Sequence, residues 1–156
     1  MILNRNISEA YWMGKALEEA RVAFDEDEVP VGAVIVRDGI LLGRGHNQNR
    51  TLGDPTAHAE IIAITAACDK TGESRLEGAD IFVTLEPCAM CAGALVLARI
   101  RRLYFGVYDD KTGACGSIFD VVREPRLNHN VEVYNGLEKE RCAGLLEEFF
   151  AAKRKQ

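Results

Sequence analysis

Apolar residues recur at helical spacing near both ends of the chain. From Ser8 to Phe24 they return every three or four positions, which is the period of a helix that buries one side. Ser8 is a residue type that caps helix N-termini, so we expect a first helix from Ser8 to about Phe24. The same spacing predicts a last helix over residues 137–154, with Phe149 and Phe150 near its end.

Two apolar runs after the first helix predict a β-hairpin. Residues 31–36 and 40–45 flank the pair Asp38-Gly39. Asp-Gly between two apolar runs indicates a tight two-residue turn, because such turns need residues that tolerate a positive φ. Pro30, which follows an acidic run, separates this hairpin from the helix before it.

Helices and strands alternate through the middle of the chain. Residues 54–67 read as a helix with Ile61, Ile62, Ile64 and several alanines on its buried side. After it we expect a turn at 72–78, a strand at 80–84, an apolar helix at 88–98, a strand at 103–105, a mostly irregular stretch at 106–130 and a strand at 131–134.

This alternation predicts the fold class. Strands joined through helices of about ten residues form βαβ units with right-handed crossovers. No repeat, low-complexity tract or linker divides the 156 residues, a length typical of one domain. We therefore expect a single α/β domain over residues 1–156, with three α/β/α layers around a mixed five-stranded sheet.

Composition and charge exclude several classes of protein. Hydrophobic residues make up 47% and charged residues 28%, which is unlike a disordered or fibrous chain. The apolar stretches are shorter than the roughly 20 residues of a membrane span, and residues 1–15 lack the pattern of a signal peptide. A net charge of −5 excludes a wholesale basic surface for nucleic acid, although it is compatible with a local basic patch.

Five cysteines without a secretory signal favour a reducing, cytoplasmic environment over a disulfide framework. Cys88 and Cys91 form the only close pair, and Cys-x-x-Cys alone is compatible with redox chemistry, half a zinc site or coincidence. We expect the other three to be ordinary buried or half-buried residues: Cys68, Cys115 and Cys142.

The chemistry is indicated by His58-Ala59-Glu60 together with Cys88 and Cys91. Each group opens a predicted helix. The two cysteines, three positions apart, share one face of a first helical turn, where the helix N-terminus favours thiolates. A histidine nitrogen can supply a third ligand, and three ligands of the Cys₂His type leave a tetrahedral position open for water, as in catalytic zinc sites.

Glu60 lies two residues beyond the histidine, near the expected metal without ligating it. Zinc lowers the pKa of a bound water from 15.7 to about 7. A carboxylate within hydrogen-bond reach can take the released proton and return it to a leaving nitrogen. These four residues therefore predict a metal-assisted hydrolytic site.

H-x-E followed by P-C-x-x-C is the signature of zinc nucleobase deaminases. Nearly the whole chain resembles the bacterial tRNA-specific adenosine deaminases, which convert the anticodon wobble adenosine to inosine. The matching positions are 11–13, 28–34, 47, 54–60, 83–88, 90–94, 105–106, 109, 111–113, 116–117, 120, 128–129 and 149–150. The chain departs from the commoner pattern at Gln48-Asn49, Tyr108 and Cys115, so the resemblance leaves contacts to the flanking bases open.

The resemblance implies a cytidine-deaminase-like fold, one zinc per chain and a role for each matching residue. His58, Cys88 and Cys91 would bind zinc, and Glu60 would shuttle protons. Among the expected substrate contacts, Asn47 would read the base, and the main chain at Ala59 and Cys88 would help hold the purine or the attacking group. The wall around the flipped nucleotide would include Asp109, Lys111, Asn128 and His129. The anticodon loop would be covered by Phe149 and Phe150, with Arg154 beyond them.

The resemblance also implies two partners, a tRNA anticodon stem-loop and a second copy of the chain paired through residues 90–98. Two other functions stay open. One is deamination of a free base or nucleoside, such as guanine or cytidine, by the same chemistry. The other is a non-catalytic tRNA-binding subunit with a structural zinc, which would have no need of Glu60. On pattern alone, Phe149 and Phe150 are core residues, and His46 is an ordinary hydrogen-bonded or surface histidine.

Overall fold

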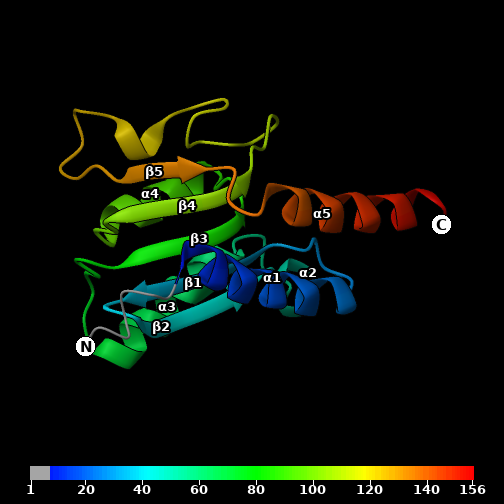
Figure 1. Ribbon diagram of the computed structural model, residues 1–156, viewed down its shortest axis with the longest axis horizontal. Helices are drawn as coiled ribbons and strands as arrows, with labels where there is room; N and C mark the ends of the chain where they lie inside the picture. The colour runs from blue at the N-terminus through cyan, green and yellow to red at the C-terminus, as the bar shows by residue number, and fades with distance from the viewer. Residues whose placement is uncertain (1–7) are drawn as a thin grey trace.

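The computed structural model describes residues 8–156 (Figure 1). The prediction that residues 1–15 are not a signal peptide therefore lies partly outside the described residues. The elements are α1 (Glu9–Asp25), β1 (Gly32–Arg37), β2 (Ile40–His46), α2 (Asn49–Leu52), α3 (Ala59–Thr71), β3 (Asp80–Leu85), α4 (Ala89–Leu97), β4 (Arg102–Val107), a short 3₁₀ helix (Val121–Arg123), β5 (Glu132–Asn135) and α5 (Lys139–Arg154).

The five strands form one mixed sheet in the order β2-β1-β3-β4-β5. β1 runs antiparallel to β2 and to β3, whereas β3, β4 and β5 are parallel to one another. The parallel strands are joined through α4 and through the long stretch after β4, since parallel neighbours need a crossover. The predicted mixed five-stranded sheet is confirmed.

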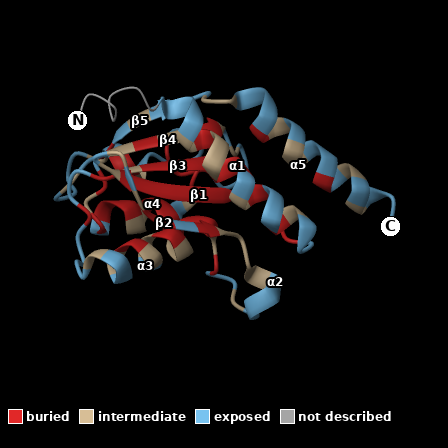
Figure 2. Cartoon of the chain, turned by 60° about the horizontal axis from the view of Figure 1, so that its bottom comes forward, coloured by how far each residue is buried: buried red, intermediate tan, exposed pale blue. Residues whose placement is uncertain are grey.

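Alternate side chains of the central strands enter two separate cores. Ile35 and Ile81 pack with α3 and α4, whereas Val34 and Phe82 pack with α1 and the start of α5. Figure 2 shows the buried strands between the two helical layers. This is the expected α/β/α arrangement. Figure 1 shows α5 running outward past the end of the sheet.

The first helix and the hairpin form as their residue types predict. The Ser8 hydroxyl accepts a hydrogen bond from the Tyr11 amide at 3.2 Å and caps α1. Asp38 and Gly39 both have positive φ, 53° and 74°, as a tight turn between β1 and β2 requires. His46, at the end of β2, contacts Glu19 and Glu26 through its two ring nitrogens. It is thus hydrogen-bonded, as expected.

Helix α3 starts five residues later than predicted. Residues 54–57 form a turn, in which the Asp54 carboxylate accepts from the Thr56 amide at 2.8 Å and from its hydroxyl at 2.7 Å. Asp-Pro at the start of an apolar segment resembles a helix start, but here the Asp54 side chain stabilises a turn instead. The helix begins only after His58, which is its N-cap residue.

The buried face of α3 also differs from the prediction. Its fully buried apolar side chains are Ala59, Ala63 and Ala67, while the isoleucines at 61, 62 and 64 are half-buried. The reason lies in β2. A Cβ atom at Gly43 would come within 2.5 Å of the Ala63 carbonyl oxygen, so the helix packs too closely for large side chains.

Helix α4 is short and strongly apolar, as predicted. It buries Cys91, Ala92, Leu95 and Val96 and leaves Leu97 78% exposed. No helix within residues 8–156 is both long and apolar enough to cross a membrane. The cysteines outside the motif are buried at 115 and 142 and half-buried at 68, as expected.

Candidate active site

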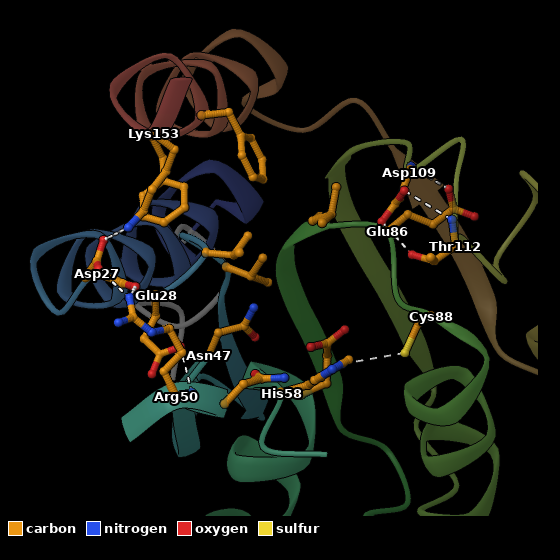
Figure 3. A pocket seen from close by; sticks show the side chains of 17 residues that line it. Asp27, Glu28, Asn47, Arg50, His58, Glu86, Cys88, Asp109, Thr112 and Lys153 are labelled. Carbon is orange, nitrogen blue, oxygen red and sulfur yellow. Dashed lines mark hydrogen bonds and ion pairs between the residues drawn. The ribbon is translucent and has the colours of Figure 1, made fainter. Parts of the chain in front are cut away.

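A pocket of about 590 Å³ opens at the edge of the sheet where β3 and β4 end. The carboxyl ends of parallel strands meet at one edge, and α/β proteins commonly place their sites there. The pocket is lined by Asp27, Glu28, Val29 and Val31 before β1, Asn47, Asn49 and Arg50 after β2, His58 and Glu60, Leu85, Glu86 and Cys88 after β3, Asp109 and Thr112 after β4, and Phe149, Phe150 and Lys153 of α5 (Figure 3).

His58 and Cys88 line this pocket, and the fully buried Cys91 lies next to both of them. The Nδ1 atom of His58 lies 3.6 Å from Cys88 Sγ and 3.5 Å from Cys91 Sγ. A tetrahedral zinc with nitrogen at about 2.0 Å and sulfur at about 2.3 Å sets such N···S separations at about 3.5 Å. The three donor atoms also lie within 4.8 Å of one another, so the group can hold a metal ion.

Two helix N-termini deliver these ligands. His58 and Cys88 are the N-cap residues of α3 and α4, both in extended conformation, and Cys91 follows in the first turn of α4. Hydrogen bonds from Cys91 and then from His58 lower the pKa of the Cys88 thiol to about 4. Cys88 is therefore available as a thiolate, the form that binds metals.

Glu60 reaches the pocket from the first turn of α3 and is only 4% exposed. Burial away from water disfavours the carboxylate and raises the pKa of Glu60 to about 7. A group that titrates near neutral pH can both accept and return a proton. It lines the same pocket as His58 and Cys88, and its role as a proton shuttle stays a prediction.

Asn47 contacts the backbone at the start of α3. Its Oδ1 accepts a hydrogen bond from the Ala59 amide at 2.9 Å. The Ala59 amide is therefore used by Asn47, and a contact from the main chain at Ala59 to a bound purine stays a prediction. The same bond orients the side chain and leaves Nδ2 of Asn47 to donate to a ligand in the pocket.

Two further buried carboxylates line the pocket, and the sequence interpretation missed both. Glu28 is 3% exposed and Glu86 is 2% exposed. Glu28 accepts from the Arg50 amide at 3.2 Å and from the Thr51 amide at 2.7 Å. Glu28 ends an acidic run, but Glu86 lies between the apolar run of residues 81–85 and Pro87, a place where a charged residue needs a specific partner. That context was the available indication.

Asp109, Lys111 and Phe150 lie at or beside the pocket. The Asp109 carboxylate is turned into its own loop, where it accepts from the amides of Lys111 and Thr112. Lys111 borders an adjoining hollow together with Phe150, Lys153 and Arg154. Phe149 is buried against Phe24, whereas Phe150 is 42% exposed at the pocket.

Asn128 and His129 do not lie on the pocket wall. They border a separate hollow with Arg99 and Arg101, and Nε2 of His129 lies 2.6 Å from the Ile100 carbonyl oxygen. Because β5 is parallel to β4, the residues before β5 lie at the edge where β4 begins, opposite the pocket. This corrects the expectation that they share a wall with Asp109.

Ion pairs join the elements on one side of the pocket. Asp27 pairs with Lys153 of α5 and with Arg50 of α2, so one carboxylate connects these two elements. The hydrogen bond from Lys153, then that from Arg50, lowers the pKa of Asp27. Figure 3 shows this group on one side of the pocket, with Glu86, Asp109 and Thr112 on the other.

Comparisons with known proteins agree on the kind of site. The family model of the MafB19-like deaminases matches residues 7–154. The chain is 50% identical over 144 residues to the tRNA-specific adenosine deaminase of Agrobacterium fabrum, covering 92% of this chain and 95% of that one.

Solved structures give the same grouping. A structure from a study of A-to-I editing by tRNA:A34 deaminases superposes with a TM-score of 0.85 at 49% identity, over 88% of this chain and all of the other. The guanine deaminase of Nitrosomonas europaea gives a TM-score of 0.78 at 27% identity, over 92% of this chain and 85% of that one. The chain thus belongs to the MafB19-like deaminase family, and within it to the tRNA-specific adenosine deaminases.

Proposed function

We propose that this protein is a zinc-dependent hydrolase that converts adenosine to inosine at the wobble position of a tRNA anticodon loop. The observation that carries the proposal is the convergence of His58, Cys88 and Cys91 beside the buried Glu60 at one pocket. The A. fabrum relative, 50% identical, is a tRNA-specific adenosine deaminase, which supports the choice of substrate.

The donor set suits one zinc ion per chain. One nitrogen and two sulfurs match the ligands that zinc prefers, and their separations match a tetrahedral site with one position left over. When bound, zinc supplies an activated water at neutral pH. The other nearby carboxylates of the pocket, Glu28 and Glu86, are occupied by backbone donors and do not complete the ligand set.

The protein's own residues supply proton transfer and orientation. The pKa of Glu60 lies at about 7, so its ionised form can take a proton from the attacking water and its protonated form can then pass that proton to the departing amino group of the base. Nδ2 of Asn47 donates to an acceptor on the purine, while its Oδ1 stays fixed by the Ala59 amide. Leu85, Val29 and Val31 give the base apolar surroundings.

The pocket mouth suits a nucleotide that is part of an RNA chain rather than a free nucleoside. Lys111, Lys153 and Arg154 lie around the opening, where the phosphates flanking a splayed-out base would pass. Phe150 is exposed there and offers a surface on which a base can stack. A single-stranded loop costs less to unstack than a duplex, which favours an anticodon loop.

A free purine is the second candidate substrate. It is favoured by the structural similarity to the guanine deaminase of N. europaea. The two substrates are separated by incubating the zinc-loaded protein with anticodon stem-loops, free adenosine, cytidine and guanine, and measuring ammonia release. We expect release from the adenosine-containing stem-loop. Release from guanine or cytidine with none from the stem-loop contradicts the proposal.

We further propose a homodimer, located in the cytoplasm. Helix α4 exposes Leu97 to 78% and Met90 to 37%, next to the half-buried isoleucines of α3. Apolar surface of this kind is typical of a protein interface. Sedimentation at micromolar concentration should give twice the 17.2 kDa chain mass, and Leu97→Arg should give the mass of one chain. A wild-type protein of one chain mass contradicts the dimer.

A further inference from the structure

Glu86 is a buried carboxylate that the proposed chemistry does not use. It follows β3 directly and precedes Pro87 and the ligand Cys88. Its side chain turns toward the loop of residues 109–117, which follows β4, and away from His58 and Cys88 (Figure 3). Within residues 8–156 it has no ion-pair partner, so the loop alone compensates its burial.

The loop supplies hydrogen-bond donors to both carboxylate oxygens. Oε1 accepts from the Asp109 amide at 2.9 Å and from the Ser117 hydroxyl. Oε2 accepts from the Cys115 amide at 2.9 Å and from the Ser117 amide at 3.0 Å. Three backbone amides from one short loop thus point at one side chain. Backbone donors to a charged acceptor are strong and strictly directional.

The backbone of the loop also packs closely against the Glu86 side chain, with no free space between them at Gly113. A Cβ atom at Gly113 would overlap Oε1 of Glu86 and lie 2.5 Å from the Asp109 carbonyl oxygen. The Ala114 amide donates to the Pro87 carbonyl at 2.9 Å, which joins the loop to the chain just before Cys88. The loop is therefore held on two sides, and Glu86 is the central contact.

We propose that Glu86 is a positioning residue that sets the place of Asp109 and Thr112 in the pocket wall. Both residues line the pocket, and the Asp109 amide is one of the donors to Glu86. The Asp109 carboxylate in turn accepts from the Thr112 amide and hydroxyl, so displacing the backbone at Asp109 displaces Thr112 as well. Glu86 thereby determines how the wall meets the bound nucleotide. This inference rests on the proposed function for its substrate, but not for the loop geometry.

Glu86→Gln tests the proposal with minimal change in shape. Whichever way the introduced side-chain amide is turned, its NH₂ group faces at least one backbone N–H, because amide donors point at both oxygens of Glu86. We expect hydrogen–deuterium exchange in peptides covering residues 109–117 to rise about tenfold or more, with α1 and α3 unchanged. Zinc content should equal that of the wild type. Neither measurement needs RNA, so both stand even where the proposed substrate is wrong.

Kinetics on the anticodon stem-loop separate positioning from a merely structural role. We expect Glu86→Gln to raise KM about ten- to a hundredfold with kcat within about threefold. A double-mutant cycle with Asp109→Ala should be non-additive, the double variant being no worse than the poorer single one within about threefold. The proposal is overturned if the effects of the two single substitutions on kcat/KM multiply in the double variant. It is also overturned if Glu86→Gln lowers kcat and loses zinc, or if its KM equals that of the wild type.

Two other variants keep the test decisive. Ser117→Ala removes the hydroxyl donor to Oε1 while leaving Glu86 and the backbone donors in place, and it should raise KM less than Glu86→Gln does. If Glu86→Gln does not fold, an unchanged KM in Ser117→Ala overturns the proposal. Glu124→Gln is the matched control, since that carboxylate pairs with Arg126 outside the loop and should change neither exchange nor kinetics.

Discussion

At the level of single residues, the site contains two groups, Cys88 and Glu60, whose surroundings shift their pKa values in opposite directions. Hydrogen bonds lower the pKa of Cys88 to about 4, while burial raises the pKa of Glu60 to about 7. One group is thereby suited to hold a metal and the other to exchange a proton at neutral pH. Two titratable groups with displaced pKa values in one pocket mark a division of roles.

The division between ligand and shuttle can be measured directly. Glu60→Ala should keep its zinc and its affinity for the stem-loop, while deamination falls by at least the 10²–10⁴-fold typical of general acid–base catalysis. His58→Ala should lose both zinc and activity, because one of three protein ligands is gone. Zinc content and turnover of the two purified variants provide the comparison. Near-normal turnover in Glu60→Ala, or zinc loss matching that of His58→Ala, refutes the assigned role.

At the scale of elements, the depth of α3 against the sheet decides where His58 and Glu60 lie. Gly43 and Gly45 of β2 let the backbone of α3 approach closely, with Ala59 and Ala63 at the points of contact. The start of α3 is further held by the bond between Asn47 and the Ala59 amide. The positions of His58 and Glu60 thus depend on glycines and alanines that have no reactive side chain.

A methyl group added at this contact should be costly. A Cβ atom at Gly45 would lie 2.6 Å from the Ala59 carbonyl oxygen, and backbone cannot give way as a side chain can. We expect Gly45→Ala to lower the free energy of unfolding by about 1–3 kcal/mol. Gly14→Ala is the matched control in α1, where an added Cβ would have no atom of another element of residues 8–156 within 4 Å, and it should raise that free energy by about 0.5–1 kcal/mol. Urea unfolding of both variants measures the two changes in the free energy of unfolding. Equal changes in Gly45→Ala and Gly14→Ala contradict the packing argument.

Glu28 connects the chain before β1 to α2, and its contribution to stability should depend on pH. Burial opposes its ionisation, but hydrogen bonds from Thr51 and Arg50 outweigh this and hold the pKa of Glu28 below its ordinary 4.5. A lowered folded-state pKa stabilises the fold above the unfolded-state pKa, and this stabilisation is lost as the pH falls through the folded-state pKa.

Glu28→Gln should therefore destabilise the protein by about 1–3 kcal/mol at pH 7, where backbone donors lose a charged acceptor. The difference from the wild type should shrink as the pH falls through 4.5. Urea unfolding at pH 7 and at pH 4 measures it. Glu132→Gln, which changes an exposed carboxylate paired with Arg102, should show little difference at either pH. A constant gap between Glu28→Gln and the wild type contradicts the hydrogen-bond account.

At the scale of the whole molecule, an acidic protein is proposed to bind RNA. The net charge is −5, yet Lys111, Lys153 and Arg154 gather beside the pocket mouth, where α5 extends past the sheet. Because charge is screened within about 10 Å at ordinary salt, this local group can attract phosphate despite the overall sign.

The salt dependence of binding tests that local attraction. Each phosphate contact on single-stranded RNA contributes about 0.7 to the slope of log affinity against log salt. Arg154→Ala should weaken stem-loop binding and reduce that slope by about 0.7. Lys139→Ala, at the other end of α5, removes the same charge far from the mouth and should leave the slope unchanged. A fall in slope in both variants, or in neither, contradicts a phosphate contact at Arg154.

Local residue patterns were sufficient to predict most of the elements and the candidate reacting groups. Helix and strand periods, the Ser8 cap and the Asp38-Gly39 turn depend on neighbours in the chain, so local pattern predicts them. His58, Cys88, Cys91 and Glu60 are identified as candidates by residue types at a fixed spacing, and the structure brings the first three close enough to hold a metal ion. The alanine face of α3 was not predictable from its own residues, because glycines on another element dictate it.

The residues that surround the pocket are brought there by packing between distant segments of the chain. Glu28 and Glu86 look like ordinary surface charges until loops distant in sequence supply their backbone donors. Asn128 and His129 lie away from the pocket because β5 runs parallel to β4, a direction that no local pattern encodes. Periodicity and motifs report contacts within a few residues, whereas strand direction and carboxylate burial arise from packing between segments far apart in the chain.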